Sequence, residues 1–101
     1  MGFQLIHPRE METILGERNG LLIDVRPQEE YRMGHHPMAR NLPYDMLDLW
    51  MRRLPGNRPL VLYCQYGSTS LMAARRLGRA GYEVYTVVGG FDAMKKVDRQ
   101  L

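Results

Sequence analysis

The sequence predicts one α/β domain built on a five-stranded, mainly parallel sheet that helices flank on both faces. Short β-type runs alternate along the chain with segments of helical pattern, and parallel strands need such crossover connections. The two strongest runs, 21–23 and 60–62, are continuous apolar segments, as strands buried on both sides should be. A length of 101 residues leaves room for one core, so residues 1–101 are expected to form a single domain.

The expected elements follow in order along the chain. Strands are predicted at 4–6, 21–24, around 40–42, 60–63 and 84–88. Helices are predicted at 8–17, 27–33, 44–53, 68–79 and roughly 91–97. Pro8 suits the first turn of the first helix, and Gly20 follows its end.

Composition excludes several classes of protein. With 45% hydrophobic and 25% charged residues the chain is of globular composition, which excludes disorder and collagen-like structure. Its longest apolar runs fall far short of the ~20 residues of a membrane helix, and its first residues lack the pattern of a secretory signal. We therefore expect a cytoplasmic protein with no membrane partner. The net charge of +3 is a mild excess that attracts small anions, and no nucleic-acid partner is expected.

The single cysteine, Cys64, stands where the strand 60–63 gives way to a polar loop. One cysteine forms no internal disulfide and supplies no structural zinc site. In open α/β sheets, ligand sites lie outside the carboxyl ends of the strands, which is where this loop begins. By position alone Cys64 is either a buried filler or a reagent.

The loop after Cys64 has the properties of an anion cradle. Its members are Gln65, Tyr66, Gly67, Ser68, Thr69 and Ser70. None is proline, so all six backbone N–H groups can point at one anion as the loop wraps into the next helix, and they favour the thiolate. Gly67 permits the dihedral angles of such a wrap. The three hydroxyls add donors, and Ser68 or Thr69 could also cap the helix, which is compatible with a role in the cradle.

Two sets of residues resemble the rhodanese-like sulfurtransferases in their small single-domain form. The first set is Asp24-Val25-Arg26, Glu30-Tyr31-x-x-Gly34-His35 and Ala39-x-Asn41-Leu42-Pro43; the second is Tyr63-Cys64, Gly67, Ser70, Ala73-Ala74, Leu77, Gly81-Tyr82, Val84 and Gly89-Gly90. The resemblance runs from Leu21 to about Met94. It implies that Cys64 accepts a sulfane sulfur from a small or protein-bound donor, holds it as a persulfide, and passes it to an acceptor such as a thiol, cyanide or a protein. No metal or organic cofactor is required.

The active loop departs from the family pattern in its charge. Many members that use thiosulfate carry an arginine where Thr69 or Gln65 stands, and that arginine pairs with the oxyanion of the donor. Both residues are uncharged here. We therefore expect thiosulfate or, favoured by this absence, a persulfide, a polysulfide or a protein-bound sulfur as the donor. His36, Met38 and Arg40 also stand where the family more often has isoleucine, glycine and isoleucine.

The same residues allow other interpretations. Cysteine phosphatases need an arginine six residues after the cysteine, where this chain has Ser70. A non-catalytic module that binds a partner or senses oxidants stays open, although no second cysteine is present to resolve an oxidised thiol. Four other groups of residues are expected to have structural or surface roles. They are the neighbouring His35 and His36, the pair Asp24 and Arg26, the helix cations Arg75, Arg76 and Arg79, and the aromatic residues Trp50 and Tyr66. The two aromatic residues could alternatively line the mouth of the pocket.

Overall fold

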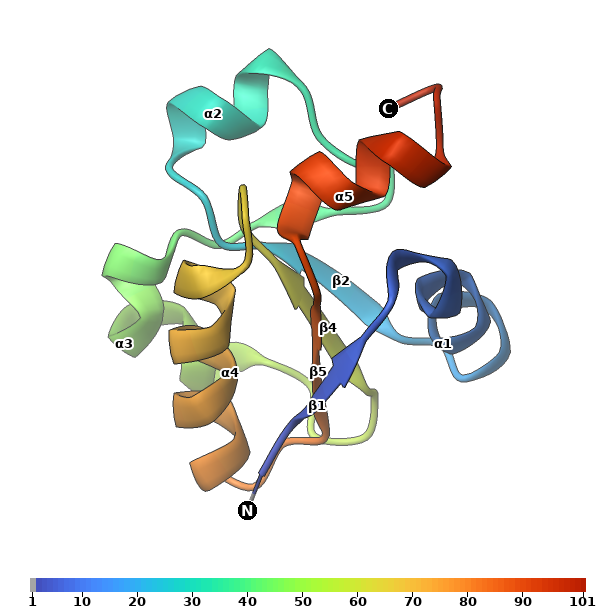
Figure 1. The fold of residues 1–101 in the computed structure, drawn as a ribbon. Helices are drawn as coiled ribbons and strands as arrows, with labels where there is room; N and C mark the ends of the chain where they lie inside the picture. The colour runs from blue at the N-terminus through green and yellow to red at the C-terminus, as the bar shows by residue number, and fades with distance from the viewer. Residues whose placement is uncertain (1) are drawn as a thin grey trace.

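The computed structural model describes residues 2–101, which form a five-stranded sheet between two layers of helix (Figure 1). The strand order is β1-β5-β4-β2-β3, and every neighbouring pair is parallel. The strands are β1 (Gln4–Ile6), β2 (Leu21–Asp24), β3 (Arg40–Asn41), β4 (Leu60–Tyr63) and β5 (Val84–Val87). The predicted fold class is confirmed, and among the described residues the sheet is parallel throughout.

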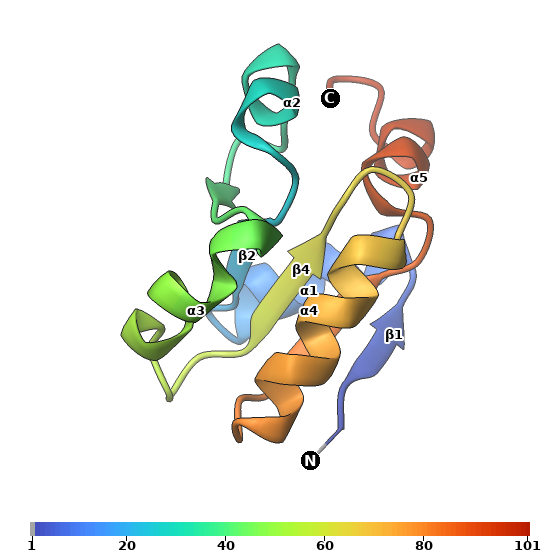
Figure 2. The same cartoon turned by 90° about the vertical axis from the view of Figure 1, so that its left-hand side faces the viewer.

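Helices cover both faces of the sheet. They are α1 (Met11–Glu17), α2 (Gln28–Met33), α3 (Leu47–Trp50), α4 (Ser68–Arg79) and α5 (Gly90–Val97). Helices α3 and α4 lie on one face and α1 and α5 on the other, while α2 lies beyond the carboxyl ends of the strands (Figure 2). No helix within residues 2–101 is both long enough and apolar enough to cross a bilayer.

The two central strands explain the uninterrupted apolar runs. Every residue of β2 and β4 is buried. Leu60 and Leu62 pack into the core beneath α3 and α4, whereas Val61 and Tyr63 pack into the core beneath α1 and α5. Because both faces of β4 are covered, polar residues follow only where the chain leaves the sheet at its carboxyl edge. Cys64 begins the loop at that point.

Two predicted helices differ in detail from the structure. Residues 8–17 begin with a 3-10 turn, η1 (Pro8–Glu10), because the His7 side chain accepts the Arg9 N–H and the Glu10 carboxylate accepts the His7 N–H. Residues 44–53 divide into η2 (Tyr44–Met46), α3 and η3 (Met51–Arg53). Trp50 is buried there and its Nε1 donates to the Pro43 carbonyl at 2.8 Å, so it belongs to the core rather than to a pocket mouth.

Candidate functional site

The candidate site is built around the Cys64 sulfur at the carboxyl end of β4. The Gly67 and Ser70 amides donate to Sγ at 3.1 and 3.3 Å. Gly67 is the N-cap of α4 with φ of 116°, a backbone conformation that side chains rarely allow, and it turns the chain so that the helix begins at the sulfur. The thiol is 4% exposed. Directed amides at the positive end of a twelve-residue helix stabilise negative charge on this sulfur.

The structure brings the predicted cradle residues together in two different ways. The amides of Gly67 and Ser70 contact the sulfur itself. The remaining four line an open pocket of about 170 Å³ together with Cys64: Gln65, Tyr66, Ser68 and Thr69. The alternative in which Ser68 or Thr69 caps the helix is wrong, since the N-cap is Gly67 and no side chain caps that end. The pocket leaves space beside Sγ for a further sulfur atom.

A buried pair of hydroxyls extends the site beneath the sulfur. The Cys64 thiol donates to Ser70 Oγ at 3.5 Å, the Thr86 hydroxyl donates to the same oxygen at 2.9 Å, and Ser70 in turn donates to the Gly67 carbonyl at 3.2 Å. A hydroxyl has one proton and two acceptor positions, so every hydrogen-bonding position of the Ser70 hydroxyl is used while the sulfur is a thiol. When the sulfur is a thiolate, the Ser70 proton can turn towards it. Thr86 was missed from the sequence because it lies inside β5, where nothing local marks it as a site residue.

The start of α5 holds the active loop in its shape. Phe91 N–H donates to the Cys64 carbonyl at 2.7 Å and Asp92 N–H donates to the Gln65 carbonyl at 3.1 Å. These two bonds hold the loop in the shape that places the Gly67 and Ser70 amides at the sulfur. Gly90, at φ of 61°, allows the approach, because a Cβ there would lie 2.4 Å from the Cys64 carbonyl oxygen. In the sequence, the Gly89-Gly90 pair after β5 belonged to the family pattern, but nothing local showed this contact.

Asp24 and Arg26 form a buried ion pair beside the site, as expected. Arg26 Nε and Nη2 donate to the Asp24 carboxylate at 3.0 and 2.7 Å, Nη2 also donates to the Gly34 carbonyl, and Nη1 donates to Gln65 Oε1 at 2.9 Å. Burial is the largest single influence and lowers the pKa of Arg26, but the hydrogen bonds to Asp24 together with the nearby negative charges outweigh it, so the arginine pKa lies above its usual value. The guanidinium also lies over the Phe91 ring, 4.4 Å from its centroid. This cation is therefore fixed, and it holds the Gln65 side chain.

The two histidines, His35 and His36, contact residues of the neighbouring chain segments. The His35 ring stacks on Tyr31 with centroids 3.6 Å apart, and its Nδ1 lies 2.8 Å from the Tyr31 carbonyl. His36 is buried, and its Nδ1 accepts the Met38 N–H at 3.1 Å while Nε2 faces the Glu12 carboxylate at 3.5 Å. Within residues 2–101 no three His, Cys, Asp or Glu side chains are grouped as metal ligands. The histidines thus order the chain between α2 and β3.

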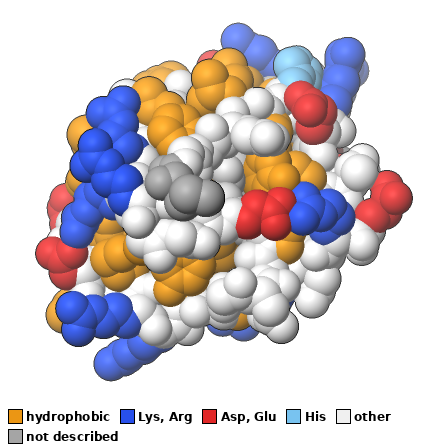
Figure 3. Space-filling view, turned by 90° about the horizontal axis from the view of Figure 1, so that it is seen from below, with side chains coloured by type: hydrophobic (Ala, Val, Ile, Leu, Met, Phe, Trp, Pro, Cys, Tyr) orange, Lys and Arg blue, Asp and Glu red, His pale blue; other side chains and the backbone are white. Residues whose placement is uncertain are grey.

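Two further candidates lie on the surface. Tyr66 is 73% exposed at the rim of the Cys64 pocket, and Arg76 pairs with Asp48 across α4 and α3. Seen from the opposite end of the sheet, hydrophobic, basic and acidic side chains are interspersed (Figure 3). That end holds a hollow of about 500 Å³ lined by Phe3 and Tyr82, with no cysteine, serine or histidine in its lining. The Cys64 pocket at the carboxyl edge is therefore the stronger candidate for a site of thiol chemistry.

A cysteine at the end of a central parallel strand, with a helix N-terminus directed at its sulfur, defines an α/β domain equipped for thiolate chemistry. Residues 7–97 match the Rhodanese-like domain family, and the chain belongs to that family.

Solved structures show both a similar small protein and similar parts of larger ones. A rhodanese homologue from the extremely thermophilic bacterium Thermus thermophilus is 34% identical with a TM-score of 0.73, and the match covers 89% of this chain and 99% of that one. Reduced Bacillus anthracis CoADR-RHD is 32% identical with a TM-score of 0.88 over 97% of this chain, which spans 17% of that protein. The NAD-dependent persulfide reductase from A. fulgidus is 26% identical with a TM-score of 0.71, and 16% of it is covered. The same domain thus occurs in short chains and within longer enzymes.

Proposed function

We propose that this protein is a sulfurtransferase that carries sulfane sulfur as a persulfide on Cys64. The observation that carries the proposal is the Sγ atom held by the Gly67 and Ser70 amides at the edge of a pocket open to solvent. A core cysteine needs neither directed amides nor a pocket. Such donors stabilise a thiolate and equally the negative charge of a terminal persulfide sulfur.

The proposed cycle has two balanced displacements. The Cys64 thiolate attacks the outer sulfur of a donor R–S–S–H, a bond forms between Sγ and that sulfur, and the donor S–S bond breaks with its electron pair leaving on R–S⁻. An acceptor thiolate or cyanide then attacks the outer sulfur of Cys64–S–S–H and returns Cys64 as a thiolate. Neither step needs a metal, an organic cofactor or an external oxidant, and a reducing cytoplasm suits the free thiol.

The charges around the pocket support a persulfide or polysulfide donor over thiosulfate. Arg26 is the nearest arginine lining the pocket, but four of its five N–H donors are already used by Asp24, Gly34 and Gln65. The other charged residue in the lining is Glu30, so the lining offers the oxygen atoms of thiosulfate no unoccupied cation. Thr69, where a thiosulfate-binding arginine would stand, offers a hydroxyl only.

Intact-protein mass spectrometry tests the proposal. The reduced protein is incubated separately with thiosulfate and with inorganic polysulfide, with Cys64→Ser as the control. We expect polysulfide to add the mass of one sulfur atom, cyanide or a thiol to remove it, and the serine variant to stay unchanged. If neither donor loads folded, reduced Cys64, the transfer cycle is refuted and a partner-binding or redox-sensing module becomes the better explanation.

A further inference from the structure

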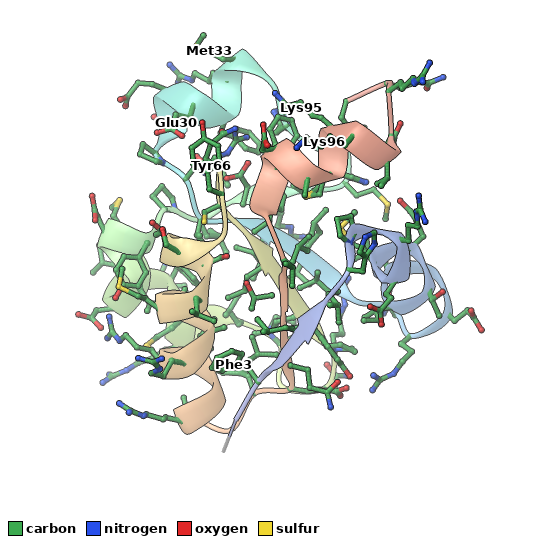
Figure 4. The ribbon with its side chains drawn as sticks, in the orientation of Figure 1. Phe3, Glu30, Met33, Tyr66, Lys95 and Lys96 are labelled. Atoms are coloured by element: carbon green, nitrogen blue, oxygen red, sulfur yellow. The ribbon has the colours of Figure 1, made fainter. Side chains whose placement is uncertain are left out.

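A groove between α2 and α5 lies next to the Cys64 pocket. It has a volume of about 270 Å³, with the Phe91 ring and Met33 among its lining. The groove and the Cys64 pocket share Arg26, Glu30 and Gln65, so the two hollows are adjacent. Figure 4 shows Glu30 on α2 near Tyr66 of the active loop, with Lys95 on α5 across from them.

Two opposite charges in this groove form no direct ion pair. Arg26 is paired with Asp24, whereas Glu30 and Lys95 form no ion pair with any residue in 2–101; the charge of Glu30 acts on Arg26 at longer range. The Lys95 ammonium lies 5.2 Å from the centroid of the Phe91 ring, which keeps it at the groove. The groove therefore presents one free carboxylate and one free ammonium on separate helices, with no net charge.

We infer that this groove binds a free amino-acid thiol, L-cysteine, as the acceptor of the sulfur. The α-ammonium of the ligand pairs with Glu30 and its α-carboxylate pairs with Lys95, while its short side chain carries the thiolate towards Cys64. A zwitterion matches two isolated opposite charges better than an anion or a cation does, since either of those would meet one repulsive partner. The inference rests on the proposed function, because it supplies the acceptor of that cycle.

The transfer step keeps all atoms and electrons. The thiolate of the bound cysteine attacks the outer sulfur of Cys64–S–S–H, the new S–S bond forms on the ligand, and the old one breaks towards Sγ. The products are cysteine hydropersulfide and the Cys64 thiolate, whose charge the Gly67 and Ser70 amides receive. In the reverse direction the same groove accepts cysteine hydropersulfide as a donor.

The test compares four thiols that differ in charge. The protein is loaded with inorganic polysulfide and desalted, and the loss of the added sulfur is timed by mass spectrometry after mixing with L-cysteine, cysteine methyl ester, N-acetylcysteine or 2-mercaptoethanol. Lys95→Gln and Glu30→Gln remove the two proposed contacts. Lys96→Gln and Glu29→Gln are the matched controls, because each makes the same change of charge on the adjacent residue of the same helix, outside the groove lining. Each variant is compared with the parent protein for the same thiol, so intrinsic thiol reactivity cancels.

We expect Lys95→Gln to slow sulfur transfer to L-cysteine and to N-acetylcysteine about fivefold, and to leave the transfer rates to the other two thiols unchanged. At ~1.4 kcal/mol per tenfold, a fivefold change equals about 1 kcal/mol, which is the contribution of an exposed ion pair. Glu30→Gln should slow transfer to L-cysteine and to cysteine methyl ester by a similar factor. Equal effects on all four thiols, or equal effects of the control variants, overturn the inference. Failure of polysulfide to load refutes the proposed function itself, whereas normal loading without this selectivity refutes only the cysteine site.

Discussion

Gly90→Ala tests whether α5 shapes the active loop. A Cβ at this position would stand 2.4 Å from the Cys64 carbonyl oxygen and 2.7 Å from the Gln65 carbonyl carbon, and the residue has φ of 61°. Left-handed backbone costs a side chain ~1–2 kcal/mol and overpacking costs ~1–3 kcal/mol. We expect the free energy of unfolding to fall by about 2–5 kcal/mol.

The same substitution should also slow the chemistry in molecules that remain folded. Relief of the clash requires the loop to move away from α5, which lengthens the bonds from Phe91 and Asp92 and moves the amides that contact Sγ. Since a displacement of ~1 Å can cost a hundredfold in rate, we expect sulfur loading to slow by about that factor in molecules that remain folded.

Urea unfolding and the rate of loading by polysulfide measure the two effects. Gly16→Ala is the control, because Gly16 lies in α1 with nothing within 4 Å of an added Cβ, and alanine there should stabilise the helix by up to ~1 kcal/mol. If Gly90→Ala unfolds at the same urea concentration as the parent and loads at the same rate, the role assigned to α5 is refuted.

Three further predictions concern charge and burial. Thr69→Arg should allow thiosulfate to load the protein at least tenfold faster than the parent in the mass assay, and an unchanged rate would count against the missing arginine as the cause. Asp24→Asn should lower the free energy of unfolding by about 3–5 kcal/mol, because it leaves the buried Arg26 cation without its ionic partner. Urea denaturation at neutral pH tests this, and a loss below ~1 kcal/mol would contradict it. Burial raises the pKa of Tyr63 far above its usual value near 10, so the folded protein keeps that proton when the unfolded chain loses it; the corresponding stability is present below pH ~10 and falls as pH rises beyond it. In an alkaline titration followed by ultraviolet absorbance, Tyr63 should ionise only as the protein unfolds, and its ionisation alongside the exposed tyrosines would refute this.

The sequence was most informative for features that are determined by the local sequence of a single segment. The continuous apolar runs of β2 and β4 predicted two-sided burial, and the helix 68–79 is observed with the predicted bounds. The position of Cys64 after β4 and the proline-free loop predicted where a thiolate site would lie. These inferences need only local pattern and the rule that parallel strands place their carboxyl ends at one edge.

Contacts between segments that are distant in the sequence could not be predicted from local sequence pattern. The Thr86 hydroxyl reaches Ser70 from β5, and Arg26 reaches Gln65 across 39 positions of sequence. Each depends on which strands become neighbours, and strand order does not follow from the pattern of any single strand. The division of residues 44–53 also escaped prediction, although the Trp50 side chain bonds to Pro43 only seven positions away, because sequence pattern does not show such a side-chain contact with the backbone.

The order of strands also decides when Cys64 gains its environment during synthesis. The ribosome releases β4 and the active loop before β5, yet the bonds to the Cys64 and Gln65 carbonyls come from residues 91 and 92, and β1 pairs only with β5. Such distant partners form late compared with local helices. A nascent chain therefore carries Cys64 on a loop that lacks these bonds until α5 has emerged.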